Sequence, residues 1–164
     1  MNDALPRSEK NADVVAVPLP GAATATSVLE RQRDDPGEGS RLETAKIIVA
    51  GGRGVGSADG FRTLEKLAAT VGGAVGASRV ACDLGWVPQS RQIGLSGKTV
   101  SPDLYIAVGI SGASQHMAGC GKARAILAIN TDPDASIFKD ATFGVVGDYR
   151  EIVPALIEQI TGTK

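Results

Sequence analysis

The chain has 164 residues, 43% of them hydrophobic and 4% aromatic, and its formal net charge of −1 is typical of one globular domain. Because positive charge is not in excess, nucleic acid is not an expected partner. A single histidine and two separated cysteines, Cys82 and Cys120, argue against a metal centre, and no stretch is apolar for long enough to insert into a membrane.

Residues 1–44 differ in composition from the rest of the chain. They are rich in proline, glycine, serine and mixed charge, which is typical of a leader or linker, or of a remnant of a missing N-terminal domain, with one short strand at 14–17. The run VVAVPLP is cut by prolines and follows no basic start, so no signal peptide is expected. The thiols are then reduced and buried, as in cytoplasmic proteins. A compact domain is predicted over residues 45–164.

Strands and helices alternate along this domain. Aliphatic runs predict five strands, which lie within residues 45–52, 73–78, 103–112, 123–132 and 141–148. Helices are predicted within 57–72, 77–87, 113–119 and 149–160; the first carries Phe61, Leu64, Leu67 and Ala68 at helical spacing and stops at Gly72. The last contains Pro154, which is tolerable if the helix begins only just before it. The alternation predicts an α/β fold with a parallel sheet, in which ligands bind beyond the carboxyl ends of the strands.

Two turns at these strand ends carry candidate binding residues. The first, GGRGVGS at 51–57, has glycines that let the backbone approach a ligand and a fixed positive charge at Arg53. It is neither GxGxxG nor a Walker motif, and a flexible strand–helix turn is the alternative. The second is the long connection over 76–105, in which each polar residue alone is more simply a solvated loop residue. Its candidates are Ser78, Arg79, Gln92, Ser96 and Lys98.

A third turn, VGISGASQH at 108–116, leads from a strand through Gly109, Ser111 and Gly112 into a short helix. Free N–H groups at a helix start favour an anion, and Ser111 can cap the helix or touch a phosphate. His116 follows about one turn further on; the alternative is a structural histidine.

A fourth candidate region consists of Asn130 and Asp148, which each end an aliphatic strand. Such residues receive ribose hydroxyls or an adenine edge in dinucleotide folds, or simply form turns. The four regions together predict a nucleotide or dinucleotide site, and they do not identify the cofactor.

Three stretches resemble the FAD-binding domain of the electron transfer flavoprotein α subunit. They are IIVAGGRGVGS, AVGASRVACDLGWVPQSRQIGLSGKTVSPDLYIAVGISGASQHMAG and AILAINTDPDASIF, in the family's order and spacing, and the likeness extends from about residue 45 to residue 160. The resemblance implies a parallel-sheet, nucleotide-binding fold of the deoxyhypusine-synthase-like type, with helices on both faces, that holds FAD. It implies an electron carrier without bond chemistry on a substrate. The implied partners are the electron transfer flavoprotein β subunit, in a heterodimer, a flavin dehydrogenase such as an acyl-CoA dehydrogenase as donor, and a quinone-linked oxidoreductase as acceptor.

The resemblance also implies roles for matching residues. Residues 93–96 flank the redox-active central ring nitrogen of the flavin, residues 111–116 run from the pyrophosphate to the flavin, and Asn130, Asp148 and Tyr149 surround the AMP half. Arg79 lies against the isoalloxazine and His116 near its pyrimidine carbonyl, where a cation or hydrogen-bond donor stabilises negative charge. The full expected cofactor-binding set is Arg53, Ser78, Arg79, Gln92, Ile93, Gly94, Leu95, Ser96, Ser111, Gly112, Ala113, Ser114, Gln115, His116, Asn130, Asp148 and Tyr149.

The chain departs from the family in two places. Ser96 stands where threonine is usual, which keeps the hydroxyl but loses the methyl group that stiffens the side chain. Residues 1–44 stand where a complete α subunit carries a further N-terminal domain.

Two other functions remain open at this point. One is an NAD-binding enzyme of the related fold, which would need a lysine or acid poised over the nicotinamide; Lys98 is the candidate. The other is an interaction domain without a cofactor, against which Arg53, Arg79, Ser96 and His116 argue together.

Overall fold

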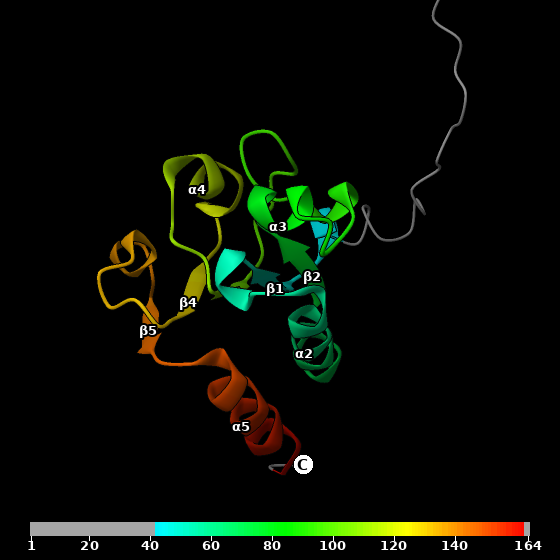
Figure 1. The fold of residues 1–164 in the computed structure, drawn as a ribbon, viewed down its shortest axis with the longest axis vertical. Helices are drawn as coiled ribbons and strands as arrows, with labels where there is room; N and C mark the ends of the chain where they lie inside the picture. Colours follow the sequence, from blue (N-terminus) through cyan, green and yellow to red (C-terminus); the bar gives the residue numbers. More distant parts are fainter. Residues whose placement is uncertain (1–41, 163–164) are drawn as a thin grey trace, which may run out of the picture. The chain divides into compact units, whose positions relative to one another are not determined.

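The computed structural model describes residues 42–162, which lie in one compact unit of the chain, and the strand predicted at 14–17 lies outside the described residues. Five parallel strands form one sheet in the order β2-β1-β3-β4-β5 (Figure 1). The strands are β1 (Ile47–Gly51), β2 (Ala74–Ala77), β3 (Leu104–Val108), β4 (Ala125–Asn130) and β5 (Phe143–Val146). All five fall within the stretches predicted from the sequence, so the predicted parallel α/β sheet is confirmed.

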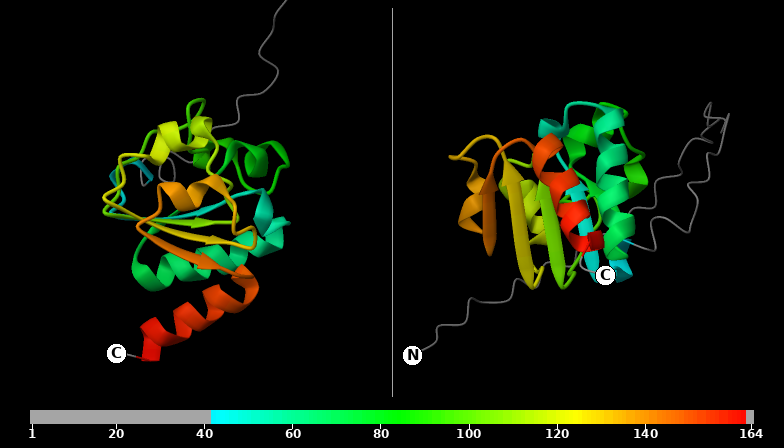
Figure 2. Two further views of the ribbon diagram at one scale, coloured as in Figure 1. Left: turned by 90° about the vertical axis from the view of Figure 1, so that its left-hand side faces the viewer. Right: turned by 90° about the horizontal axis from the view of Figure 1, so that it is seen from below.

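Helices cover both faces of this sheet. They are α2 (Ala58–Val71), α3 (Arg79–Asp83), α4 (Ser114–Cys120) and α5 (Tyr149–Gly162), with short 3-10 turns η1 (Arg53–Val55), η2 (Gln89–Arg91) and η3 (Ser136–Lys139). Figure 2 shows α2 and α5 side by side on one face, with α4 on the other. Two hydrophobic clusters match these faces: Val49 and Ile106 pack toward α2 and α5, whereas Ile48 and Tyr105 pack toward the opposite face. The predicted coverage of both faces is therefore confirmed.

The first long helix follows directly from its sequence. Phe61, Leu64, Leu67 and Ala68 are buried along one face of α2, as their helical spacing predicts. The Ser57 hydroxyl accepts a hydrogen bond from the Gly60 N–H at 3.2 Å and caps the start of the helix. Gly72 ends it in the left-handed conformation with φ +66°, which favours glycine.

Two sequence expectations about the ends of the domain need correction. Leu42 is buried in the same cluster as Ile48, so the packed unit includes residues that were assigned to the leader. The closing helix α5 begins at Tyr149, which places Pro154 in its second turn and not at its start. Pro154 therefore removes one helical hydrogen bond to the Arg150 carbonyl. The helix persists because its neighbour Val153 is fully buried against the core.

Both cysteines are free and buried, as expected. Burial raises the pKa of the Cys82 and Cys120 thiols to about 11, so both stay protonated at neutral pH.

Candidate functional site

The order of the strands places a crevice between β1 and β3. The chain leaves β1 toward β2 on one side and returns to β3 on the other, so the loops that follow β1 and β3 diverge at the carboxyl edge of the sheet. In parallel sheets of this kind, ligands bind at that switch point. The sequence predicted a site at the strand ends, and the strand order narrows this to the ends of β1 and β3.

Glycines in these two loops bring the loops into contact with each other, and their predicted role of letting the backbone approach a ligand stays a prediction. The Gly54 N–H donates to the Gly109 carbonyl at 3.0 Å, and the Gly52 N–H donates to the Val108 carbonyl at 2.9 Å. A Cβ at Gly54 would stand 2.8 Å from the Gly109 Cα, which is closer than real Cβ contacts come. These glycines allow the two loops to touch each other, and this contact forms a rigid floor at the switch point.

A cavity of about 710 Å³ opens above this floor, within the size range of small-molecule and cofactor sites. It brings together most of the predicted set: Arg53, Ser78, Arg79, Gln92, Ile93, Gly94, Leu95, Ser96, Ser111, Ala113, Gln115, His116 and Asn130. Sequence reasoning did not include Gly54, Val80, Gly109, Ile110, Asp132 and Ala135, which also line it. Each of these lies within a few positions before or after a predicted residue, so wider windows around the same strand ends would have found them.

Four predicted residues do not line the cavity, and their contacts explain why. Asp148 follows the edge strand β5, where its carboxylate accepts a hydrogen bond from the Arg150 N–H at 2.8 Å and begins α5. Tyr149 turns toward α2, and its hydroxyl donates to the Val55 carbonyl at 2.9 Å. Gly112, with φ +85°, packs against the backbone of Ile137, and the Ser114 hydroxyl contacts Gln115. Their cofactor roles remain predictions.

Two buried polar atoms in the cavity wall lack a hydrogen-bond partner among the described residues. They are Ser78 Oγ and His116 Nδ1. Polar atoms that are buried without a partner are rare in folded proteins, because each costs about 1–3 kcal/mol. Both atoms fit a site that a polar ligand completes.

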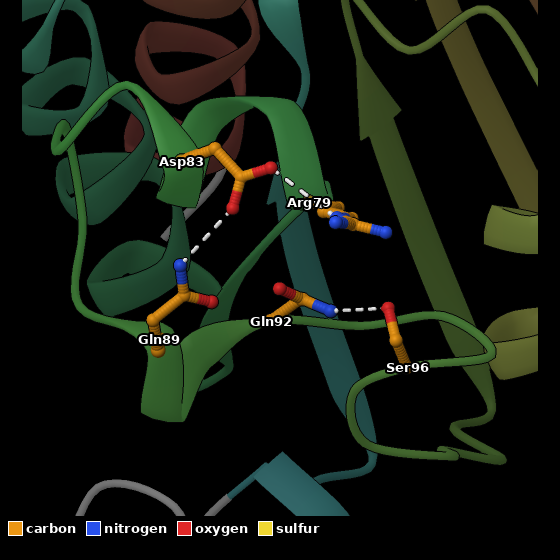
Figure 3. Close-up of polar contacts among 5 residues, drawn as sticks. All are labelled: Arg79, Asp83, Gln89, Gln92 and Ser96. Atoms are coloured by element: carbon orange, nitrogen blue, oxygen red, sulfur yellow. Dashed lines mark hydrogen bonds and ion pairs between the residues drawn. The ribbon is translucent and has the colours of Figure 1, made fainter.

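Arg79 is held at the cavity edge by a small polar network (Figure 3). Its Nε donates to Asp83 Oδ2 at 3.2 Å, and Gln89 Nε2 donates to Asp83 Oδ1, also at 3.2 Å. Figure 3 shows the terminal guanidinium nitrogens on the side away from Asp83. The network therefore occupies one edge of the guanidinium and leaves its terminal nitrogens turned away from the carboxylate.

The segment with Gln92 and Ser96 forms another wall. Gln92 Nε2 donates to Ser96 Oγ at 2.9 Å, as Figure 3 shows, so the Ser96 hydroxyl keeps its own proton for a second partner. The segment is tied to its neighbours by the Ile93 N–H, which donates to Ala77, and by the Leu95 N–H, which donates to Gln115. This part of the 76–105 connection, for which a functional loop and a solvated loop were both considered, is an ordered wall.

His116 lies near the start of α4 and is 8% exposed. The helix is capped at Ala113, so Ser111 does not cap it; the Ser111 carbonyl accepts from the Ile137 N–H instead. Burial lowers the pKa of His116 from 6.5 to about 4, although the Ile93 carbonyl acts in the opposite direction. The imidazole is thus neutral at pH 7. Of the two roles considered for His116, hydrogen-bond donor and cation, only the first agrees with this burial.

Asn130 forms a turn, which is one of its two predicted roles, and its contact with the cofactor stays a prediction. Its amide Nδ2 donates to the Ile110 carbonyl at 3.0 Å, and its Oδ1 accepts from the Asp132 N–H at 3.1 Å. It therefore forms a turn and joins the ends of β4 and β3 at the cavity. Lys98, by contrast, does not line the cavity and forms an ion pair with Glu43 at 3.2 Å.

Within residues 42–162, no group of His, Cys, Asp and Glu is arranged to hold a metal ion, and no helix has the length and hydropathy to cross a membrane.

Comparison with known proteins identifies the family. Residues 41–121 match the electron transfer flavoprotein FAD-binding domain. Electron transfer flavoprotein subunit alpha of Bacillus subtilis is 57% identical over 122 residues, which cover 74% of this chain and 38% of that protein. The Mycobacterium leprae subunit alpha is 50% identical over 150 residues, which cover 92% of this chain and 47% of that protein. Among solved structures, one described as a thiamin diphosphate-dependent enzyme from Mycobacterium smegmatis has a TM-score of 0.42 and 19% identity over 73% of this chain and 26% of that one.

The chain spans less than half the length of these two relatives. The family match covers the cavity walls from Arg53 to His116, and the two unpartnered polar atoms lie within the same segment. The chain belongs to the electron transfer flavoprotein α family and carries its FAD-binding domain, so its cofactor is FAD.

Proposed function

We propose that this domain is an electron carrier, which takes electrons from one redox partner and delivers them to another without bond chemistry on a substrate. The observation that carries the proposal is the composition of the cavity wall. It offers two guanidinium groups, Arg53 and Arg79, a free hydroxyl proton on Ser96 and a neutral imidazole on His116. These groups bind and stabilise negative charge, whereas a substrate enzyme needs a base or nucleophile poised for reaction.

FAD, when bound, supplies the ring that takes up and releases electrons. The protein contributes orientation and charge. The Arg79 guanidinium, held by Asp83, places a fixed positive charge at the cavity edge, and a charge-assisted hydrogen bond contributes about 1.5–3 kcal/mol. Ser96 donates a neutral hydrogen bond, with its orientation set by Gln92. Both effects favour a more negative cofactor and so raise its reduction potential.

We infer the partners from the family. The relatives are named as α subunits, which supports pairing with an electron transfer flavoprotein β subunit. A flavin dehydrogenase, such as an acyl-CoA dehydrogenase, is the proposed donor, and a quinone-linked oxidoreductase the proposed acceptor. The proposed site of action is the cytoplasm, which agrees with two buried, protonated thiols.

The NAD-enzyme alternative loses its main support because Lys98 is paired with Glu43 and does not line the cavity. A cofactor-free interaction domain has no use for the unpartnered Ser78 and His116 atoms.

An absorbance spectrum of the purified chain tests the proposal first. Flavin bands, with FAD and not FMN released by heat, support it; NAD binding without flavin, or no cofactor binding, would refute it. The loaded chain is then reduced anaerobically and mixed with a one-electron acceptor dye. Stoichiometric dye reduction is expected, and a flavin that cannot be reduced and reoxidised reversibly would contradict the carrier role.

A matched pair of variants tests the role of the cavity. Arg79→Gln removes a charge at the cavity edge, and Arg62→Gln removes one on the exposed surface of α2. Only the first should weaken FAD binding or lower the potential of the bound FAD. Equal effects of the two variants would mean that general charge, and not the cavity, controls the cofactor.

A further inference from the structure

A buried tyrosine contacts the only histidine of the chain. Tyr105, on β3, is fully buried, and its hydroxyl oxygen lies 2.9 Å from His116 Nε2. The two rings are tilted by 51° with centroids 6.2 Å apart, so they meet through the hydrogen bond and do not stack. The other ring nitrogen, Nδ1, is the unpartnered atom at the cavity wall. Nε2 is thus bonded to the core, and Nδ1 is available to a ligand in the cavity.

The position of the imidazole proton follows from the neighbouring groups. Burial keeps His116 neutral and keeps the Tyr105 hydroxyl protonated, because it lowers the first pKa and raises the second well above its ordinary value. The tyrosine proton has two hydrogen-bonding neighbours, His116 Nε2 and the Cys120 thiol. An imidazole nitrogen accepts well and a thiol sulfur weakly, so the proton goes to Nε2.

The backbone around the ring agrees with this assignment. The Cys120 thiol lies 3.6 Å from the His116 carbonyl, to which it donates, so the thiol has its own acceptor.

We propose that Tyr105 is a positioning residue: its hydroxyl donates to His116 Nε2 and fixes the neutral imidazole as the Nδ1–H tautomer, which offers a hydrogen-bond donor at the cavity wall. Without this contact, a neutral histidine would be free to present an acceptor to the cofactor. Because FAD carries carbonyl acceptors on its flavin ring, a donor recognises it and an acceptor repels it. The effect on FAD rests on the function proposed above, whereas the tautomer is a property of the cofactor-free chain.

The single histidine makes the tautomer directly measurable. In the full-length, cofactor-free chain labelled with ¹⁵N-histidine, long-range ¹H–¹⁵N correlations show only two ring nitrogens. We expect Nδ1 to be pyrrole-type and Nε2 pyridine-type at pH 7. The Tyr105→Phe chain should lose this single-tautomer pattern, and Cys120→Ala should retain it. An Nε2–H tautomer in the parent chain, or no change in Tyr105→Phe, would refute the proposal.

Tyr149→Phe is the matched control, because it removes the other tyrosine hydroxyl of the chain, which is bonded to Val55 and not to His116. It should leave the histidine spectrum unchanged. Circular dichroism confirms that each variant is folded; should Tyr105→Phe unfold, the parent and Cys120→Ala spectra still decide the tautomer.

FAD titration tests the second half of the proposal. Loss of one neutral hydrogen bond should weaken FAD binding about twofold to tenfold in Tyr105→Phe and not in Cys120→Ala, which keeps the tautomer. A changed tautomer with unchanged FAD affinity and potential would refute the positioning role. If the parent chain binds no FAD but shows the Nδ1–H tautomer, the proposed function fails while the tautomer assignment stands.

Discussion

Substitution of Ser78 by alanine should stabilise the cofactor-free domain and weaken its binding of FAD. The Ser78 hydroxyl is buried at the cavity wall without a hydrogen-bond partner among the described residues. It stands at the N-cap of α3 but forms no side-chain cap bond, so alanine loses no contact there. A buried hydroxyl without a partner costs about 1–3 kcal/mol, and its removal should recover about 1 kcal/mol or more.

The binding effect has the opposite sign. In the loaded protein the hydroxyl gains a partner on the cofactor, and loss of that bond costs about 0.5–1.5 kcal/mol, which is about a twofold to tenfold rise in Kd. Urea unfolding of the cofactor-free chain and titration with FAD measure the two quantities. Ser78→Ala should raise the urea midpoint of the cofactor-free chain and also raise its Kd for FAD.

Ser57→Ala provides the control, because Ser57 is also an N-cap serine but its hydroxyl accepts from the Gly60 N–H. That variant should lose about 0.5–2 kcal/mol of stability and keep its FAD affinity. A Ser78→Ala chain that is destabilised like Ser57→Ala would show that the Ser78 hydroxyl is satisfied within the protein. A Ser78→Ala chain that binds FAD as tightly as the parent would show that the hydroxyl gains no partner on the cofactor.

Three further predictions follow from particular residues. The pKa of His116 falls from 6.5 to about 4 on folding, so when the pH is lowered from 7 to 5 this histidine binds a proton in the unfolded chain but not in the folded one. The free energy of unfolding should therefore fall by about 2 kcal/mol over that range, and urea unfolding of His116→Gln should lack this part of the pH dependence. Arg79→Ala should lower the first reduction potential of bound FAD by about 60 mV, the equivalent of about 1.4 kcal/mol for one electron, and spectroelectrochemistry that finds no shift in a folded, loaded variant would exclude the role. Pro154→Ala should raise the free energy of unfolding by about 1–3 kcal/mol by restoring a hydrogen bond in α5, and a loss of stability would mean that the proline ring packs usefully.

The elements of the fold could be predicted because their signals are local. The spacing of Phe61, Leu64 and Leu67, the cap at Ser57 and the stop at Gly72 all lie within one helix and agree with one another. The position of α5 was equally clear, but the reason given for Pro154 was wrong. A proline's cost depends on what the rest of the helix buries, and sequence spacing does not measure that.

Membership of the site was less predictable because it depends on strand order and on which way a side chain turns. Asp148 ends a strand as Asn130 does, yet only Asn130 lines the cavity, since β5 is the edge of the sheet and β4 lies further inside. Tyr149 follows directly but turns to the opposite face. The contact of Tyr105 with His116 could not be predicted either, because the continuous apolar run of β3 shows no alternation that would indicate which residues share a face.

The floor and the side wall of the site are built in different ways, and this difference predicts how each tolerates substitution. The floor consists of backbone contacts between the β1 and β3 loops, where Gly52, Gly54 and Gly109 leave no room for a Cβ. The side wall consists of side chains such as Gln92 and Ser96, on a connection fixed to its neighbours by a few main-chain hydrogen bonds. Because a Cβ in the floor meets backbone, a change there must move whole strands and affects folding itself. A change in the side wall alters one donor or charge, so cofactor affinity and potential can vary among proteins with this fold while the floor stays constant.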